Sequence, residues 1–430
     1  MKNIKSRLII MNFLQFAVWG SYLTSMGGYL FAAGYGELIG WFYAMQGIVS
    51  MFMPAIMGII ADKLIPAQRL LGLCHGIAAL FIAGAGFCGQ NDMLWPMFTL
   101  YSLSVAFYMP TLALSNSVAY TILEQGGYDT VKAFPPIRVF GTVGFIVAML
   151  VCDFAGFQSS PVQFFQCAII GVVLAVYAQM LPNCPVNRSS ENKSFAQRLG
   201  LDAFKLFKNK QMAMFFIFSM LLGVSLQITN GFANSFITSF KNIPEFANTF
   251  GANHANALIS LSQVSETLCI LLIPFCLKRF GIKRVMLIAM FAWVLRFGLF
   301  GLGNPGSGLW MFILSMIVYG VAFDFFNISG SLFVNENTSG QMRSSAQGLF
   351  MIMTNGIGAT VGTLGAQAVV NRLVPATESV DDVVTNGLSV VEGWSTTWLA
   401  FAGYALVVAL LFMVLFRYKH DANKQMDINH

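Results

Sequence analysis

The stretch "VYGVAFDFFNISGSLFV", residues 318–334, is apolar for most of its length, yet it carries the carboxylate of Asp324 near its middle. It belongs to an apolar run that begins at residue 309, and a membrane-spanning helix needs about 20 mainly apolar residues. An aspartate at the centre of such a helix costs roughly 2.5–3.5 kcal/mol on insertion scales. The stretch therefore predicts a membrane helix, and we expect its acid to face a water-filled cavity instead of lipid.

The composition of the whole chain points to the same class. Of its 430 residues, 57% are hydrophobic and only 10% are charged, and the mean hydropathy is +0.69. A soluble domain carries about 25% charged residues, so we expect an all-α polytopic membrane protein. The formal net charge of +6 does not indicate nucleic-acid binding, because the basic residues do not gather on one soluble face.

The cysteines and histidines give no indication of a metal or another cofactor. The 7 cysteines fall mostly inside apolar stretches without C-x-x-C spacing, and the 4 histidines are scattered. Cysteines in such places are usually small hydrophobic residues of helices. We therefore expect no cofactor and no metal site.

Twelve apolar runs have the length of a membrane span, and the longest polar insert lies between the sixth and the seventh. This insert, 183–210, is expected to be a cytoplasmic linker between an N-terminal six-helix bundle, 1–182, and a C-terminal six-helix bundle, 211–430. The twelve runs are 8–31, 38–60, 68–88, 94–121, 136–155, 162–182, 211–238, 253–277, 282–302, 309–333, 344–371 and 394–416.

The distribution of basic residues predicts the orientation of the spans. If the N-terminus lies inside, all but three of the 24 lysines and arginines fall at or near cytoplasmic segments. The exceptions are Lys241 and Arg372, which fall outside, and Arg296, which lies within a span. Cytoplasmic loops carry an excess of Lys and Arg, so both termini are expected in the cytoplasm.

The loop between the second and third spans reads "GIIADKLIPAQR", residues 58–69. Gly58 would allow two helices to approach closely, and Asp62 and Lys63 would close a short cytoplasmic turn. The loop resembles the G-x-x-x-D-[RK] signature of the major facilitator superfamily, and "LKRFGIKR" at 277–284 is a weaker echo. The resemblance implies the superfamily's two-bundle fold and a gating or structural role for this motif. The alternative is that Asp62 only caps a helix.

Polar side chains at helical spacing mark four candidate binding clusters. In "AFPPIRVFGTVGF", 133–145, Arg138, Thr142 and Phe145 lie at i, i+4 and i+7, and hence on one helix face. A cation, a hydroxyl and an aromatic ring on one stripe suit a polar, planar ligand. The alternative is that Arg138 extends to the inner membrane interface.

The second cluster is a pair of carboxamides at i and i+3, and the third is a carboxamide followed by an acid at the same spacing. Gln227 and Asn230 lie in "SLQITNGF", and Gln263 and Glu266 lie in "SLSQVSETLCILL". Carboxamides both donate and accept, so they can recognise sugar hydroxyls or base edges; the alternative is hydrogen bonding between helices. Glu266 lies several residues inside an apolar run. A buried acid without a partner favours its protonated form, and a proton-coupled carrier requires a group that takes up a proton in this way.

The fourth cluster is the opening stretch itself, where Tyr319, Phe323 and Asn327 follow one stripe and Asp324 lies beside Phe323. Aromatic rings can stack on a flat base, which contributes about 1–3 kcal/mol, although such a stripe is usually only packing. The embedded Arg296 either pairs with an acid or holds the C-terminal bundle together.

Taken together, the quoted motifs resemble the bacterial nucleoside:H+ symporter family of the major facilitator superfamily, from about residue 8 to residue 418. The stretches that carry the resemblance are "FLQFAVWGSYLT" (13–24), "MPAIMGIIADK" (53–63), "YMPTLAL" (108–114), "FPPIRVFGT" (134–142), "LQITN" (226–230), "ISLSQVSET" (259–267) and "YGVAFDFFNISGS" (319–331).

The resemblance implies a monomeric symporter of a bacterial inner membrane that binds a nucleoside between its two bundles and moves it by alternating access. The residues that it implies for nucleoside binding are Arg138, Thr142, Phe145, Gln227, Asn230, Gln263, Glu266, Tyr319, Phe323 and Asp324. Asp324 and Glu266 would carry the proton, with Arg138 as a possible counter-charge. One alternative is a sugar or glycoside symporter of the same fold. Another is a membrane-embedded enzyme or receptor, for which the chain offers no catalytic constellation.

Overall fold

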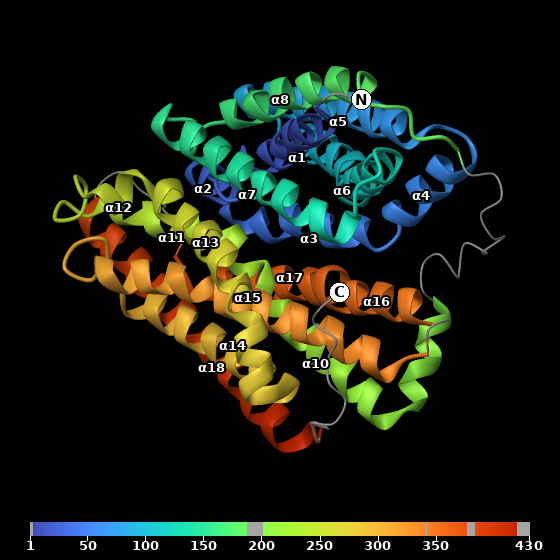
Figure 1. Ribbon diagram of the computed structural model, residues 1–430. Helices are drawn as coiled ribbons and strands as arrows, with labels where there is room; N and C mark the ends of the chain where they lie inside the picture. Colours follow the sequence, from blue (N-terminus) through green and yellow to red (C-terminus); the bar gives the residue numbers. More distant parts are fainter. Residues whose placement is uncertain (1–2, 187–200, 340–341, 376–382, 419–430) are drawn as a thin grey trace. The chain divides into compact units, whose positions relative to one another are not determined.

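The computed structural model describes residues 3–186, 201–339, 342–375 and 383–418 (Figure 1). Throughout these ranges the regular structure is helical and contains no strand, which confirms the expected all-α class. Part of the predicted linker, 187–200, lies outside the described residues.

The helices of the N-terminal half follow one another through short connections, as expected of neighbouring membrane spans. They are α1 (Ile4–Gly20), α2 (Met26–Ala32), η1 (Gly36–Leu38), α3 (Ile39–Ser50), α4 (Met53–Lys63), α5 (Ala67–Gln90), α6 (Leu94–Gln125), α7 (Thr130–Phe154) and α8 (Val162–Gln179).

The C-terminal half contains shorter pieces between its long helices. Its elements are η2 (Leu201–Lys208), α10 (Lys210–Leu226), α11 (Ile228–Ser239), η3 (Phe240–Asn242), α12 (Phe250–Asn253), α13 (Ala255–Ile270), α14 (Ile273–Leu302), α15 (Leu309–Asn337), α16 (Arg343–Met351), η4 (Ile352–Gly358), α17 (Ala359–Leu373) and α18 (Val383–Leu415).

The chain forms two compact units. The first comprises Met1–Tyr29 and Met45–Leu199, and the second comprises Leu30–Ala44 and Gly200–His430. In the second unit, the carboxamide of Gln367 accepts a hydrogen bond from the backbone N–H of Gly40 and donates one to the carbonyl of Gly36. The predicted bundle boundaries at 182 and 211 stay a prediction.

Within the described residues, nine helical segments are long and apolar enough to cross a membrane, and the bent pair Gly36–Ser50 and Met53–Ala61 makes a tenth. The two remaining predicted spans are also helical, but each is interrupted. The first is divided into α1 and α2 by a turn, and the eighth consists of α13 and the beginning of α14.

Gly281 separates the eighth and ninth predicted spans inside α14. Its backbone has φ 73° and ψ 166°, outside the helical region, so the chain changes direction there. A positive φ is strained for residues with a Cβ, whereas glycine adopts it readily. The echo motif around Gly281 therefore marks a sharp turn between two helices.

Glycines bring particular helix pairs into backbone contact. A Cβ added to Gly20 on α1 would overlap the backbone of Phe145 on α7, and one added to Gly144 would overlap the backbone of Phe13. In the second unit, Gly223 on α10 meets Thr354 in the same way. Small residues allow membrane helices to approach this closely, and the α1–α7 contact sets the register of the first candidate cluster.

Candidate functional site

The first candidate cluster lies on α7 and faces α1. Arg138 and Thr142 are half-buried, and Phe145 is buried. The guanidinium carbon of Arg138 lies 3.8 Å from the centre of the Phe16 ring on α1, within the range of a cation–π interaction. Trp19 of α1 meets Phe145 edge-on, with ring centres 6.2 Å apart. A cation and an aromatic ring of α7 are thus each lined by an aromatic ring of α1.

The carboxamide pair lies at a break between two helices of the second unit. Gln227 separates α10 from α11, and its Oε1 accepts a 2.8 Å hydrogen bond from Nδ2 of Asn230. Within the described part of the chain, Nε2 of Gln227 and Oδ1 of Asn230 have no hydrogen-bond partner. Membrane transporters commonly bind substrates at interrupted helices, and this pair retains a donor and an acceptor.

Two acids come together from α13 and α15. Asp324 is buried, and its Oδ2 has no hydrogen-bond partner among the described residues. Its carboxyl group interacts electrostatically with that of Glu266, which is half-buried on α13. Gln263 lies one turn before Glu266 and is also half-buried. The predicted proton-binding pair is therefore close enough in space for its charges to interact.

Two aromatic rings lie next to this acid pair. The rings of Tyr319 and Phe323 stack at 5.6 Å with an interplanar angle of 16°, and Tyr319 interacts electrostatically with Glu266 and Asp324. Phe323 is half-buried, as is Asn327 one turn further along α15. Tyr319 thus links the ring of Phe323 to the two carboxylates, and the role of these residues as a binding cluster stays a prediction.

Of the two alternatives expected for Arg296, the ion pair with an acid is not found among the described residues. In the part of the chain that the structure describes, its guanidinium instead donates hydrogen bonds to the carbonyl of Ser315 and the hydroxyl of Ser262. Its side chain is buried in the second unit.

The loop motif lies at the end of α4, away from these clusters in sequence. A Cβ added to Gly58 would meet no described atom within 4 Å, so the close helix contact expected there is not seen. Lys63 is exposed. The side chain of Asp62 lies outside the described structure, so its gating role stays a prediction.

A buried polar network in the first unit was not predicted. Gln15 on α1 donates from Nε2 to Thr111 Oγ1 of α6 at 2.7 Å, and its Oε1 is bonded to His75 Nε2 of α5 at 2.8 Å. The hydroxyl of Tyr108 donates to the carbonyl of Gln15 at 2.9 Å. Single polar residues within three separate apolar runs were the only sequence signal, and no spacing rule connects them.

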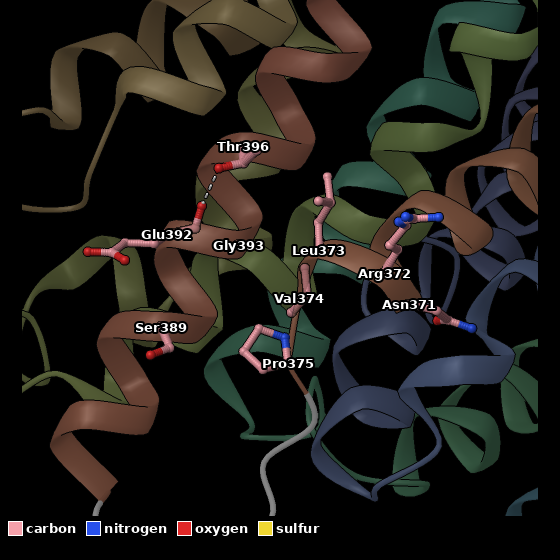
Figure 2. Close-up of a pocket in the computed structure, with 9 residues that line it drawn as sticks. All are labelled: Asn371, Arg372, Leu373, Val374, Pro375, Ser389, Glu392, Gly393 and Thr396. Atoms are coloured by element: carbon pink, nitrogen blue, oxygen red, sulfur yellow. Dashed lines mark hydrogen bonds between the residues drawn. The ribbon is translucent and has the colours of Figure 1, made fainter.

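Figure 2 shows a cleft elsewhere, between the end of α17 and α18. It has a volume of about 490 Å³, and its lining includes Arg372, Glu392 and Thr396 but none of the predicted site residues. Glu392 and Arg372 point away from one another, and Thr396 donates to the backbone carbonyl of Glu392. Nowhere in the described ranges do three His, Cys, Asp or Glu side chains gather as metal ligands.

Comparison with known proteins extends over nearly the whole chain. The family model described as "Nucleoside H+ symporter" matches residues 1–421. The chain is 47% identical over 421 residues to nucleoside permease NupG of Escherichia coli (strain K12), covering 97% of each protein. It is also 47% identical over 425 residues to the xanthosine permease of the same organism, covering 98% of each. A crystal structure of a mutant of the nucleoside transporter NupG matches with a TM-score of 0.90 and 46% identity, covering 96% of this chain and 100% of that one.

Proposed function

Because the chain belongs to the nucleoside H+ symporter family, it is a proton-coupled nucleoside transporter, and we propose that the four clusters bind the nucleoside and its proton. It is a multi-pass membrane protein of the major facilitator fold and not an enzyme. We also propose a bacterial inner membrane as its location, with both termini cytoplasmic, and a monomeric transporter that works by alternating access.

The contacts support a division of labour between the clusters. The unused donor of Gln227 and the unused acceptor of Asn230, together with Gln263, suit ribose hydroxyls or the edge of a base. Phe145 and Phe323 offer ring faces for the base. Arg138 and Thr142 add a cation and a hydroxyl on the α7 face. That both bundles contribute to one nucleoside site stays a prediction.

The acid pair carries the proposal for the proton. Asp324 is buried near the middle of α15, its Oδ2 has no hydrogen-bond partner in the described structure, and its carboxyl group interacts with that of Glu266. Two neighbouring carboxylates repel each other when both are charged. A bound proton removes one charge, relieves this repulsion and so favours reorientation of the loaded carrier. Ionisable groups within membrane-spanning helices commonly mark proton relays.

Uptake into proteoliposomes with an imposed proton gradient tests the function. We expect uridine or adenosine to accumulate only when the proton gradient is present. An excess of hexose should not compete with this uptake. If no nucleoside accumulates, the proposed function is wrong. The variants Asp324→Asn and Glu266→Gln should each lose gradient-driven accumulation. Asp153→Asn is the matched control, because Asp153 is a buried acid of the first unit that already accepts a hydrogen bond from Gln158 at 2.7 Å. Normal accumulation by both site variants would show the proton assignment to be wrong.

A further inference from the structure

The second unit encloses a cation that the proposed transport function does not use. Arg296 of α14 is 2% exposed. Its Nη1 donates to the carbonyl of Ser315 at 2.6 Å and to Oγ of Ser262 at 3.4 Å, and Nη2 also donates to Ser262 Oγ at 3.5 Å. Ser315 in turn donates its hydroxyl to the carbonyl of Arg296 at 3.0 Å. These bonds hold the plane of the guanidinium between α13, α14 and α15.

Aromatic rings surround this guanidinium where an acid would be expected. Arg296 forms no ion pair with any described carboxylate, and its Nε is buried without a described hydrogen-bond partner. The guanidinium carbon lies 4.5 Å from the centre of the Tyr319 ring and 5.3 Å from that of Phe300. The attraction of a cation to a ring face strengthens when water is excluded. The two ring faces, together with the hydrogen bonds to the serines, therefore stabilise the buried charge of Arg296.

Tyr319 connects this cation to the aromatic part of the candidate site. Its ring stacks on Phe323 at 5.6 Å and meets Trp293 edge-on at 6.0 Å. The same ring interacts electrostatically with Glu266, Arg296 and Asp324. Tyr319 thus lies in contact with both Arg296 and Phe323.

We propose that Arg296 is a positioning residue for nucleoside binding, which holds Tyr319, and through it Phe323, in the orientation that the flat base contacts. This inference rests on the proposed nucleoside site. A guanidinium suits the position because its planar fork can lie over a ring while donating to Ser315 and Ser262, whereas the ammonium of a lysine is a point charge with a different geometry.

The test separates positioning from folding by measuring KM and maximal rate per folded transporter for uridine uptake. We expect Arg296→Met to raise KM about tenfold, equivalent to about 1.4 kcal/mol, while the maximal rate changes less than twofold. Arg296→Lys should raise KM less. Arg279→Met is the matched control, since Arg279 is exposed on the same helix and lies 5.9 Å from the centre of the Phe280 ring. A KM within twofold of the native value in Arg296→Met would overturn the inference.

A double-mutant comparison tests the route through Tyr319. Tyr319→Leu should raise KM by itself, and adding Arg296→Met should raise it less than twofold further, because the ring that Arg296 supports is already absent. The proposal is contradicted if the fold-increase in KM of the double variant equals the product of the fold-increases of the two single variants. It is also contradicted if Tyr319→Leu has the native KM.

If Arg296→Met does not accumulate in the membrane, Arg296→Lys and Ser262→Ala provide the same test, because Ser262 accepts from both Nη atoms. Native KM values in both of these variants would overturn the inference. Uptake by the native protein distinguishes a failure of the proposed function from a failure of the role of Arg296. Failure of the native protein to transport any nucleoside refutes the proposed function, whereas normal native uptake together with these results refutes only the role of Arg296.

Discussion

Arg138 and Arg296 both lie within helices long and apolar enough to span a membrane, and their surroundings differ in one important respect. Both lie against an aromatic ring, Arg138 at 3.8 Å from Phe16 in the first unit and Arg296 at 4.5 Å from Tyr319 in the second. Arg138 is half-buried, whereas Arg296 is 2% exposed and bonded to Ser315 and Ser262. The same pairing of cation and ring thus occurs with a half-buried charge in the first unit and with an enclosed charge in the second.

The largest expected effect tests whether Arg138 contacts the nucleoside. Removing one partner of a buried, charge-assisted contact commonly costs 2–5 kcal/mol, so Arg138→Met should reduce uridine uptake on the order of 100-fold. Uptake and uridine binding by the purified protein, measured with Arg279→Met as the control, check this. Binding within threefold of the native affinity would mean that Arg138 is not a ligand.

A smaller effect tests how the first unit holds α1, the helix that carries Phe16. Thr111→Val removes the acceptor of the Gln15 carboxamide, and leaving a buried donor unsatisfied costs about 1–3 kcal/mol. We expect Thr111→Val to have a lower free energy of unfolding than the native protein. Thermal denaturation in detergent measures this difference. Thr111→Ser keeps the hydroxyl and serves as the control. Equal stability of both variants would show that the network adds nothing to this packing.

The smallest effect concerns the ring beneath Arg138. Phe16→Leu removes the cation–π contact, worth about 0.5–2 kcal/mol depending on hydration, so KM for uridine should rise about threefold to tenfold. Phe16→Tyr retains a ring and should stay near the native KM. If Phe16→Leu and Phe16→Tyr have the same KM for uridine, the ring does not orient Arg138. The two arginines then share a position against a ring but not a function for that ring.

Sequence patterns predicted what lies within one helix better than what lies between helices. The i, i+3 spacing put Gln227 and Asn230 on one face, and their side chains are hydrogen-bonded to each other, but the break between α10 and α11 at Gln227 was not predicted. The apolar runs located the helices. The turn that separates α1 from α2 was missed, because residues 21–25 contain no proline or glycine to mark it.

Contacts between distant segments have no spacing rule that would reveal them. This applies to Phe16 beneath Arg138 and to the bonds of Gln15 with His75 and Thr111, which join three helices. It also applies to Arg296, for which the sequence left a choice between an ion pair and a purely structural role. Among the described residues it bonds to serines of α13 and α15 and lies against a ring, which agrees with the structural alternative and not with the ion pair.

The glycines between α1 and α7 have a consequence for the energetics of turnover. Because Gly20 and Gly144 bring the two backbones into contact, no layer of side chains remains that could slide between these helices. If Arg138 binds the nucleoside as proposed, the backbone positions of Arg138 and Phe16 are fixed once, when the chain folds, and that part of the entropy is not lost again in every transport cycle.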